Sequence, residues 1–242
     1  MFTPREFQQV FLIEGQILQC CGPLFFSKSS EFKPTNVARN ATFGLVDTGQ
    51  RKILVTCHHV VEDFLEFRRE CSEAKMGILL GDNIPVELHS NQLICSDAKL
   101  DLATFDMHPI MSYCEKRKFY PLNHFSAPPL KPKDILAFVG YIGEGRCASP
   151  MGISFEYEAF GVSVADVSGD MVAVDISRTK MDLGTRATAP VSNGGISGGP
   201  CFQLFPNGCL RLVAFATSEA VGTLRLTHAA CLKSDGTIQS KC

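Results

Sequence analysis

Short stretches of this 242-residue sequence contain residue types that nucleophilic catalysis uses. Ser197 lies within the glycine-rich run Gly194-Gly195-Ile196-Ser197-Gly198-Gly199-Pro200. Because glycine costs backbone entropy, such a run marks a sharp bend or a close approach of the backbone. If Ser197 is a nucleophile, the N–H groups of Gly195 and Ser197 can turn toward one point and bind an oxyanion. The alternative interpretation is an ordinary glycine-rich turn before a strand.

A pair of histidines and an aspartate supply the other groups that such chemistry needs. His58 and His59 follow the apolar run 53–55, and a histidine has the near-neutral pKa required of a general base for serine. Asp101 precedes the apolar run 102–105, where its carboxylate can accept a hydrogen bond from the second imidazole nitrogen and fix the tautomer. Each residue alone also fits a surface, core or turn position.

The elements that must position these residues are mostly short strands. Residues 42–46 and 52–56 predict a hairpin across a glycine-containing turn, and Asn207-Gly208 predicts another between 200–205 and 210–216. Further strands are expected at 76–80, 85–88, 92–95, 102–106, 135–139, 153–160 and 172–176, with helical periodicity only at 61–71. Many short strands favour an all-β barrel or sandwich. Prolines at 128, 129 and 132 divide the chain into halves at 1–125 and 126–242.

Composition narrows the partners and the compartment. The formal net charge of −2 gives no basic excess for nucleic acid, and no apolar run is long enough to cross a membrane, so neither partner is expected. The N-terminal apolar run is cut by Glu14 and does not resemble a signal peptide. The 11 cysteines, with no CxxC pair, are therefore expected to be free thiols in a cytoplasmic protein. A zinc site near Cys57-His58-His59 lacks a second ligand pair, so we expect no metal and no other cofactor.

Taken together, these stretches resemble the chymotrypsin-like serine peptidase family over roughly residues 40–230. Thr56-Cys57-His58-His59-Val60 is similar to the family's T-A-A-H-V/C box, residues 101–103 to its D-L/I-A box, and residues 195–200 to its G-D/N-S-G-G-P box. The order His, Asp, Ser is also that of this family. The resemblance implies two orthogonal six-stranded β-barrels with the active site in the cleft between them.

Carried over by position, the resemblance implies a role for each residue of the site. His59 is the base, with His58 as the alternative one place away, and Asp101 is the orienting acid, with Asp97 and Asp106 as weaker rivals. Ser197 is the nucleophile, and the N–H groups of Gly195 and Ser197 form the oxyanion hole. Residues expected to contact the substrate side chain are Val191, Thr217, Ser218 and Glu219. Valine at 191 predicts cleavage after small or medium apolar residues, unless Glu219 points into the pocket and favours basic ones.

The resulting hypothesis is a serine endopeptidase acting on proteins or peptides. Ile196 stands where secreted members have an acid that pairs with a freed N-terminus, so the chain resembles the intracellular and bacterial branch of the family. A regulatory protein partner that orders glycine-rich loops near 140–145 and 191–195 is an alternative form of control. The competing hypothesis is a catalytically inactive relative used as a binding module, and an esterase for small molecules is a minor third option.

Overall fold

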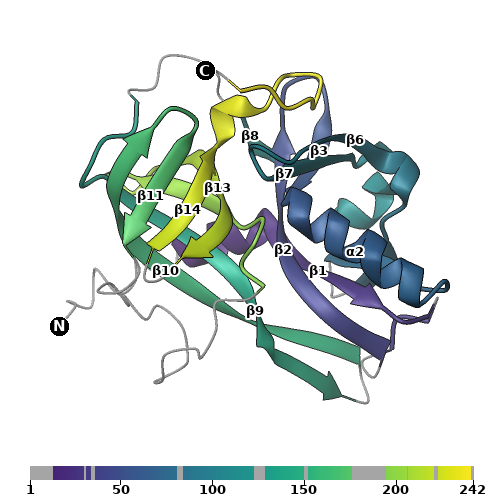
Figure 1. The fold of residues 1–242 in the computed structure, drawn as a ribbon. Coiled ribbons are helices and arrows are strands. Elements are labelled where there is room, and N and C mark those ends of the chain that lie inside the picture. Colours follow the sequence, from purple (N-terminus) through teal and green to yellow (C-terminus); the bar gives the residue numbers. More distant parts are fainter. Residues whose placement is uncertain are drawn as a thin grey trace.

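The computed structural model describes residues 13–29, 31–33, 36–80, 84–122, 129–149, 152–175, 195–205, 207–220 and 223–240. Within these ranges the chain is mostly β, in two sheets that lie side by side (Figure 1). Residues 13–19 form a helix that leads into the first strand. The sheets follow one another along the sequence, the first ending at Pro121 and the second beginning at Ile135. The boundary predicted at residue 125 lies outside the described residues.

The first sheet has eight strands in the order β5-β4-β1-β2-β3-β7-β6, and β8 pairs with β2 in parallel. Helix α2 (His58–Glu70) lies beside this sheet (Figure 1). Short 3-10 helices are η2 (Ser90–Gln92) and η3 (His108–Cys114). The strands are β1 (Cys21–Ser27), β2 (Val37–Asp47), β3 (Lys52–Thr56), β4 (Lys75–Leu80), β5 (Ile84–Glu87), β6 (Leu93–Asp97), β7 (Leu102–Asp106) and β8 (Tyr120–Pro121).

The second sheet is a closed barrel of six strands in the order β10-β11-β14-β13-β12-β9. Closure comes from the long antiparallel pairing of β9 with β10, which runs from Ile135 opposite Ser163 to Ser149 opposite Gly152. The strands are β9 (Ile135–Ser149), β10 (Gly152–Ser168), β11 (Met171–Asp175), β12 (Pro200–Leu204), β13 (Leu210–Ala220) and β14 (Thr223–His228), followed by the 3-10 helix η4 (Ala229–Cys231).

An apolar cluster joins the two sheets. It contains residues of the first sheet, among them Val55 of β3 and Leu102 of β7, together with residues of the barrel such as Phe202 and Phe215. All four of these side chains are fully buried, with an exposed fraction of 0%. Because each buried aromatic or aliphatic side chain contributes about 1.5–3 kcal/mol, this packing fixes the two sheets relative to each other.

The structure confirms the coarse expectation of a β fold with a barrel and corrects parts of it. The first half forms an eight-stranded sheet, and in the described residues its end strands β5 and β6 are not paired with each other. The turn η2 connects these strands instead, and its Gln92 amide donates to the Asp106 carbonyl at 3.0 Å. The second barrel of the prediction is therefore not confirmed.

Two local expectations can also be compared with the structure. The hairpins predicted around residues 42–56 and 200–216 are confirmed, since β2 pairs with β3 and β12 with β13 in antiparallel register. The loop predicted at 140–145 lies instead within β9, where Gly140 and Tyr141 pair with β10 and the register shifts between Tyr141 and Arg146. None of the helices in the described ranges has the length and apolar character needed to cross a bilayer.

Candidate active site

His59 is placed by the start of helix α2, which follows β3 almost directly. Val60, Val61 and Phe64 recur at helical spacing and are buried, so this face of the helix packs on the first sheet. The first N–H groups of any helix lack an intrahelical acceptor. Here the backbone N–H of His59 donates to Oδ1 of Asp101 at 3.0 Å. The carboxylate thus lies at the positive end of the helix, where an ionised acid is stabilised.

Asp101 lies in a turn just before β7, and its backbone conformation is unusual. Its φ of 52° falls in the left-handed region, which Asp and Asn tolerate better than most residues. The turn is held by the N–H of Leu100, which donates to Oδ1 of Asp97 at 2.9 Å. This conformation turns the Asp101 carboxylate toward α2 instead of along the strand.

Ser197 lies in a tight loop that leads into β12. Gly195 and Gly198 have φ values of 100° and 89°, which only glycine adopts readily. The loop is fixed by hydrogen bonds from the Gly198 N–H to the Ala216 carbonyl at 2.7 Å and from the Gly199 N–H to the Ile196 carbonyl at 2.9 Å. The backbone therefore bends sharply at the serine, as the run of glycines predicts.

The structure brings His59, Asp101 and Ser197 into one hydrogen-bonded series. His59 Nδ1 lies 2.8 Å from Oδ2 and 3.0 Å from Oδ1 of Asp101, and Nε2 lies 3.2 Å from Oγ of Ser197. Because an ionised carboxylate only accepts hydrogen bonds, Nδ1 carries the proton and Nε2 is left to accept one from the serine hydroxyl. The imidazole is thus oriented as a proton acceptor for Ser197.

The electrostatic surroundings of His59 favour its charged form. The hydrogen bond to Asp101 raises the pKa of His59 above its ordinary value of 6.5, while partial burial acts in the opposite direction. The charges of Asp101, Asp63 and Glu62 raise the pKa further. The neutral imidazole, which alone can take a proton, is therefore the main form only at pH values above this raised pKa.

Two backbone donors are available beside the serine. Among the described residues, neither the N–H of Gly195 nor that of Ser197 has a hydrogen-bond acceptor. Ser197 is half-buried, so its surroundings are reached by solvent only in part. Unpaired N–H groups at a partly desolvated position are costly unless a ligand pairs with them.

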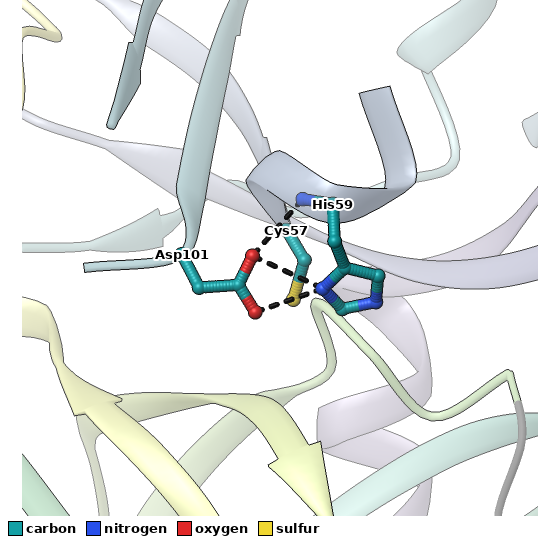
Figure 2. A group of neighbouring side chains, drawn as sticks. All are labelled: Cys57, His59 and Asp101. Carbon is teal, nitrogen blue, oxygen red and sulfur yellow. Dashed lines mark hydrogen bonds and ion pairs between the residues drawn. The ribbon is translucent and has the colours of Figure 1, made fainter. Parts of the chain in front are cut away.

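Cys57 lies next to the imidazole–carboxylate pair (Figure 2), and together the residues form the group of possible metal ligands found in the described part of the chain. The sulfur, an imidazole nitrogen and a carboxylate oxygen lie within 4.8 Å of one another. These atoms already interact: Nδ1 with the carboxylate, and the thiol with the Ala216 carbonyl at 3.2 Å. Burial raises the pKa of Cys57 well above its usual range, which disfavours the thiolate that a metal needs. The arrangement fits a hydrogen-bonded pair better than a metal centre.

The alternative candidates for the base and the acid, His58, Asp97 and Asp106, have other hydrogen-bond partners. Nδ1 of His58 lies 2.7 Å from Oγ of Ser96, and its Nε2 lies 3.2 Å from Glu62. Asp97 holds the turn before Asp101, and Oδ1 of Asp106 accepts from the N–H of His108 at 3.0 Å. Of the two histidines, His59 is the one that meets both Asp101 and Ser197.

The residues expected to contact a substrate side chain are only partly described. Thr217 is buried and its hydroxyl donates to the Arg225 carbonyl at 3.1 Å, so it holds β13 against β14. Ser218 is exposed. Val191 and the side chain of Glu219 lie outside the described residues. The expected pocket thus stays a prediction.

Sequence reasoning missed Thr42, which contacts the Ser197 loop through both its backbone and its hydroxyl. Its only sequence signal is a polar residue in an otherwise apolar stretch of β2. No protein-family model and no curated protein matches this chain.

Proposed function

We propose that this chain is a serine endopeptidase. The observation that carries the proposal is the hydrogen-bonded series from Asp101 through His59 to Ser197. A serine hydroxyl is a weak nucleophile until a base takes its proton, and a carboxylate on the other ring nitrogen fixes the tautomer that can do so. The N–H groups of Gly195 and Ser197, which have no acceptor among the described residues, support the same function.

In the proposed reaction, Oγ of Ser197 attacks the carbonyl carbon of a peptide bond while Nε2 of His59 takes the hydroxyl proton. The N–H groups of Gly195 and Ser197 bind the oxyanion that forms on the carbonyl oxygen. The imidazolium then gives its proton to the leaving amine, which leaves an acyl-enzyme. Water, deprotonated by His59, releases the acid and restores the serine. Asp101 stays ionised throughout and stabilises the imidazolium.

The proposal includes the finer architecture of two barrels with the site between them. Its support is the core of the first sheet, a single apolar cluster with buried side chains from β1, β2, β3, β4, β5 and β7. A sheet that curls into a barrel would bring its strands, including the end strand β5, around one such cluster. His59 and Asp101 come from this unit, whereas Ser197 precedes β12 of the barrel. Substrates would be proteins or peptides, with no cofactor required.

Labelling with a fluorophosphonate probe tests the proposal. The activated Oγ attacks phosphorus, the P–F bond breaks, fluoride leaves, and His59 takes the proton. We expect labelling of the unmodified protein and none after Ser197→Ala, while Ser168→Ala, an exposed serine at the end of β10, changes nothing. Peptide turnover should fall on the order of 10⁶-fold in Ser197→Ala.

The histidines provide a second comparison. His59→Ala should lose activity nearly as completely as Ser197→Ala because the groups act as a unit. His58→Ala should retain it, since His58 contacts Ser96 and Glu62 instead. An unmodified, folded protein that neither labels nor cleaves a denatured proteome would support the competing hypothesis of an inactive binding module. Labelling with turnover of esters alone would support the esterase.

A further inference from the structure

The hydroxyl of Thr42 occupies a position where β2, β9 and the Ser197 loop meet. Thr42 is fully buried, with an exposed fraction of 0%. Its Oγ1 donates to the Gly195 carbonyl at 2.7 Å and accepts from the Tyr141 N–H at 2.9 Å. A hydroxyl has one proton to donate and lone pairs to accept with, so both bonds are made at once. One buried hydroxyl thus joins the loop of the barrel to β9.

The backbone of Thr42 makes a second connection to the same loop. Its N–H donates to the Ser197 carbonyl at 2.9 Å, and its carbonyl accepts from Oγ1 of Thr56 at 3.0 Å. Thr42 therefore holds the carbonyls of both Gly195 and Ser197. These are the residues whose N–H groups the proposed function assigns to the oxyanion.

Planarity of the peptide bond shows that these contacts hold the peptide units on either side of the one that carries the Ser197 N–H. The Gly195 carbonyl belongs to the peptide unit that follows Gly195, and the Ser197 carbonyl to the unit that follows Ser197. The unit between them, which carries the Ser197 N–H, is fixed by its own carbonyl, because Ile196 accepts from Gly199 at 2.9 Å. Three successive peptide units are thus held, the outer two by Thr42.

Gly195 is the weak point of this arrangement, because a glycine at φ 100° can rotate into many other conformations. The side chain of Ile196 resists such movement on one side. It is buried and packs on Gly140, where a Cβ would lie 2.7 Å from the Ile196 Cβ. On the other side, the bond that opposes rotation of the Gly195 carbonyl comes from the Thr42 hydroxyl.

We propose that Thr42 is a positioning residue of the site: its hydroxyl holds the Gly195 carbonyl, and with it the backbone that leads into Ser197, so that the N–H of Ser197 stays turned toward the reacting carbonyl. This inference rests on the proposed function. Thr42 itself does not touch the substrate, and its contribution is made through the loop.

The test compares two substitutions at the same position. Thr42→Val keeps the shape and the backbone N–H but removes the hydroxyl, whereas Thr42→Ser keeps the hydroxyl and removes the methyl. Since losing one oxyanion donor costs about 10²–10³ in kcat, loosening the backbone that carries the Ser197 N–H should lower kcat of Thr42→Val about 10- to 100-fold. KM should change little, and Thr42→Ser should stay within about threefold of the unmodified protein. Thr42→Ala is a second hydroxyl-free variant should Thr42→Val not fold.

Thr104→Val is the matched control. Thr104 is also fully buried, and its hydroxyl donates to the Gly236 carbonyl at 2.7 Å, away from the Ser197 loop. The loss of a buried hydrogen bond should lower its melting temperature as in Thr42→Val, but leave kcat unchanged. A kcat loss in Thr104→Val equal to that in Thr42→Val would overturn the inference, because general destabilisation would then explain both.

Amide hydrogen exchange gives a readout that needs no activity. We expect faster exchange of the amides of residues 195–199 in Thr42→Val, and in neither Thr42→Ser nor Thr104→Val. An unmodified protein without labelling or turnover refutes the proposed function, while the exchange data still report on the loop. Unchanged kcat and unchanged exchange in Thr42→Val, or equal losses in Thr42→Ser, refute the role of the hydroxyl.

Discussion

Gly198 offers a test of the loop geometry that does not depend on catalysis. Its φ of 89° is unfavourable for any residue with a Cβ, and a Cβ there would lie 2.7 Å from Oγ1 and 2.8 Å from Cα of Thr56. It would also collide with the Thr42 carbonyl. Because these neighbours are mostly backbone or buried atoms, they cannot move aside cheaply.

Gly198→Ala combines two costs that can be separated. A left-handed conformation costs about 1–2 kcal/mol with a Cβ, and overpacking adds about 1–3 kcal/mol. The reduced entropy of the unfolded chain returns about 0.4–1 kcal/mol, so the net loss is about 1–4.6 kcal/mol. Gly49→Ala is the matched control, because Gly49 has a φ of 86° and nothing within 4 Å of its Cβ position. There the overpacking cost is absent, so the loss should be about 0–1.6 kcal/mol and smaller than in Gly198→Ala.

Urea unfolding followed by circular dichroism measures both free energies of unfolding. In a chain of this size each kcal/mol corresponds to about 2–4 °C in Tm, so thermal melts give an independent estimate. Equal losses in the two variants would refute the reasoning, because the crowding around Gly198 would then contribute nothing. A greater loss in Gly49→Ala would contradict the backbone geometry of the loop itself.

Two further predictions concern charge and thiols. Asp101→Asn keeps a residue that tolerates the left-handed conformation but removes the charge, so the pKa of His59, followed by NMR, should fall; an unchanged pKa would mean that Asp101 is not its main partner. Because the raised pKa favours the imidazolium in the folded state, its stabilisation is complete below pH 6.5 and is lost as pH rises through that pKa. Asp101→Asn should weaken this dependence, because Asp101 is the largest cause of the raised pKa. Thiol titration of the denatured protein without reductant should count close to 11 free cysteines, and a count several lower would indicate disulfides. In the native protein, the exposed Cys209 should react before buried cysteines such as Cys20 and Cys201.

Much of the strand pattern could be predicted because it depends on local signals. The strand at 102–106 has the predicted bounds, and the hairpins form where glycine-containing turns separate apolar runs. The helix at 58–70 begins close to the periodic segment expected at 61–71. Local patterns made Ser197, the histidine pair and Asp101 candidates, because glycine runs and polar residues beside apolar strands are visible in a single sequence, and the resemblance to the chymotrypsin-like family chose His59 as the base.

What could not be predicted depends on contacts between distant segments. The glycine-rich stretch 140–145 predicts a loop, but it lies within β9, where pairing with β10 on both sides continues the strand across a register shift between Tyr141 and Arg146. Closure of the barrel requires β9 to pair with both β10 and β12, which no local pattern shows. Thr42 is the clearest case. A threonine in a strand is ordinary, and its bond to Gly195 joins residues 153 positions apart.

The free energies of the contacts between the two sheets show whether packing or the hydrogen bond between His59 and Ser197 sets their relative position. The bond between His59 and Ser197 connects the two sheets across 138 positions, and a single hydrogen bond contributes about 0.5–1.5 kcal/mol. Phe202 and Phe215 of the cluster between the sheets each contribute about 1.5–3 kcal/mol by burial, and many other apolar side chains join them. Packing therefore places the serine beside the histidine, and the hydrogen bond follows from it. For this reason Ser197→Ala should leave the fold and the position of His59 intact, so that a loss of labelling in that variant reports the missing hydroxyl and not a displaced site.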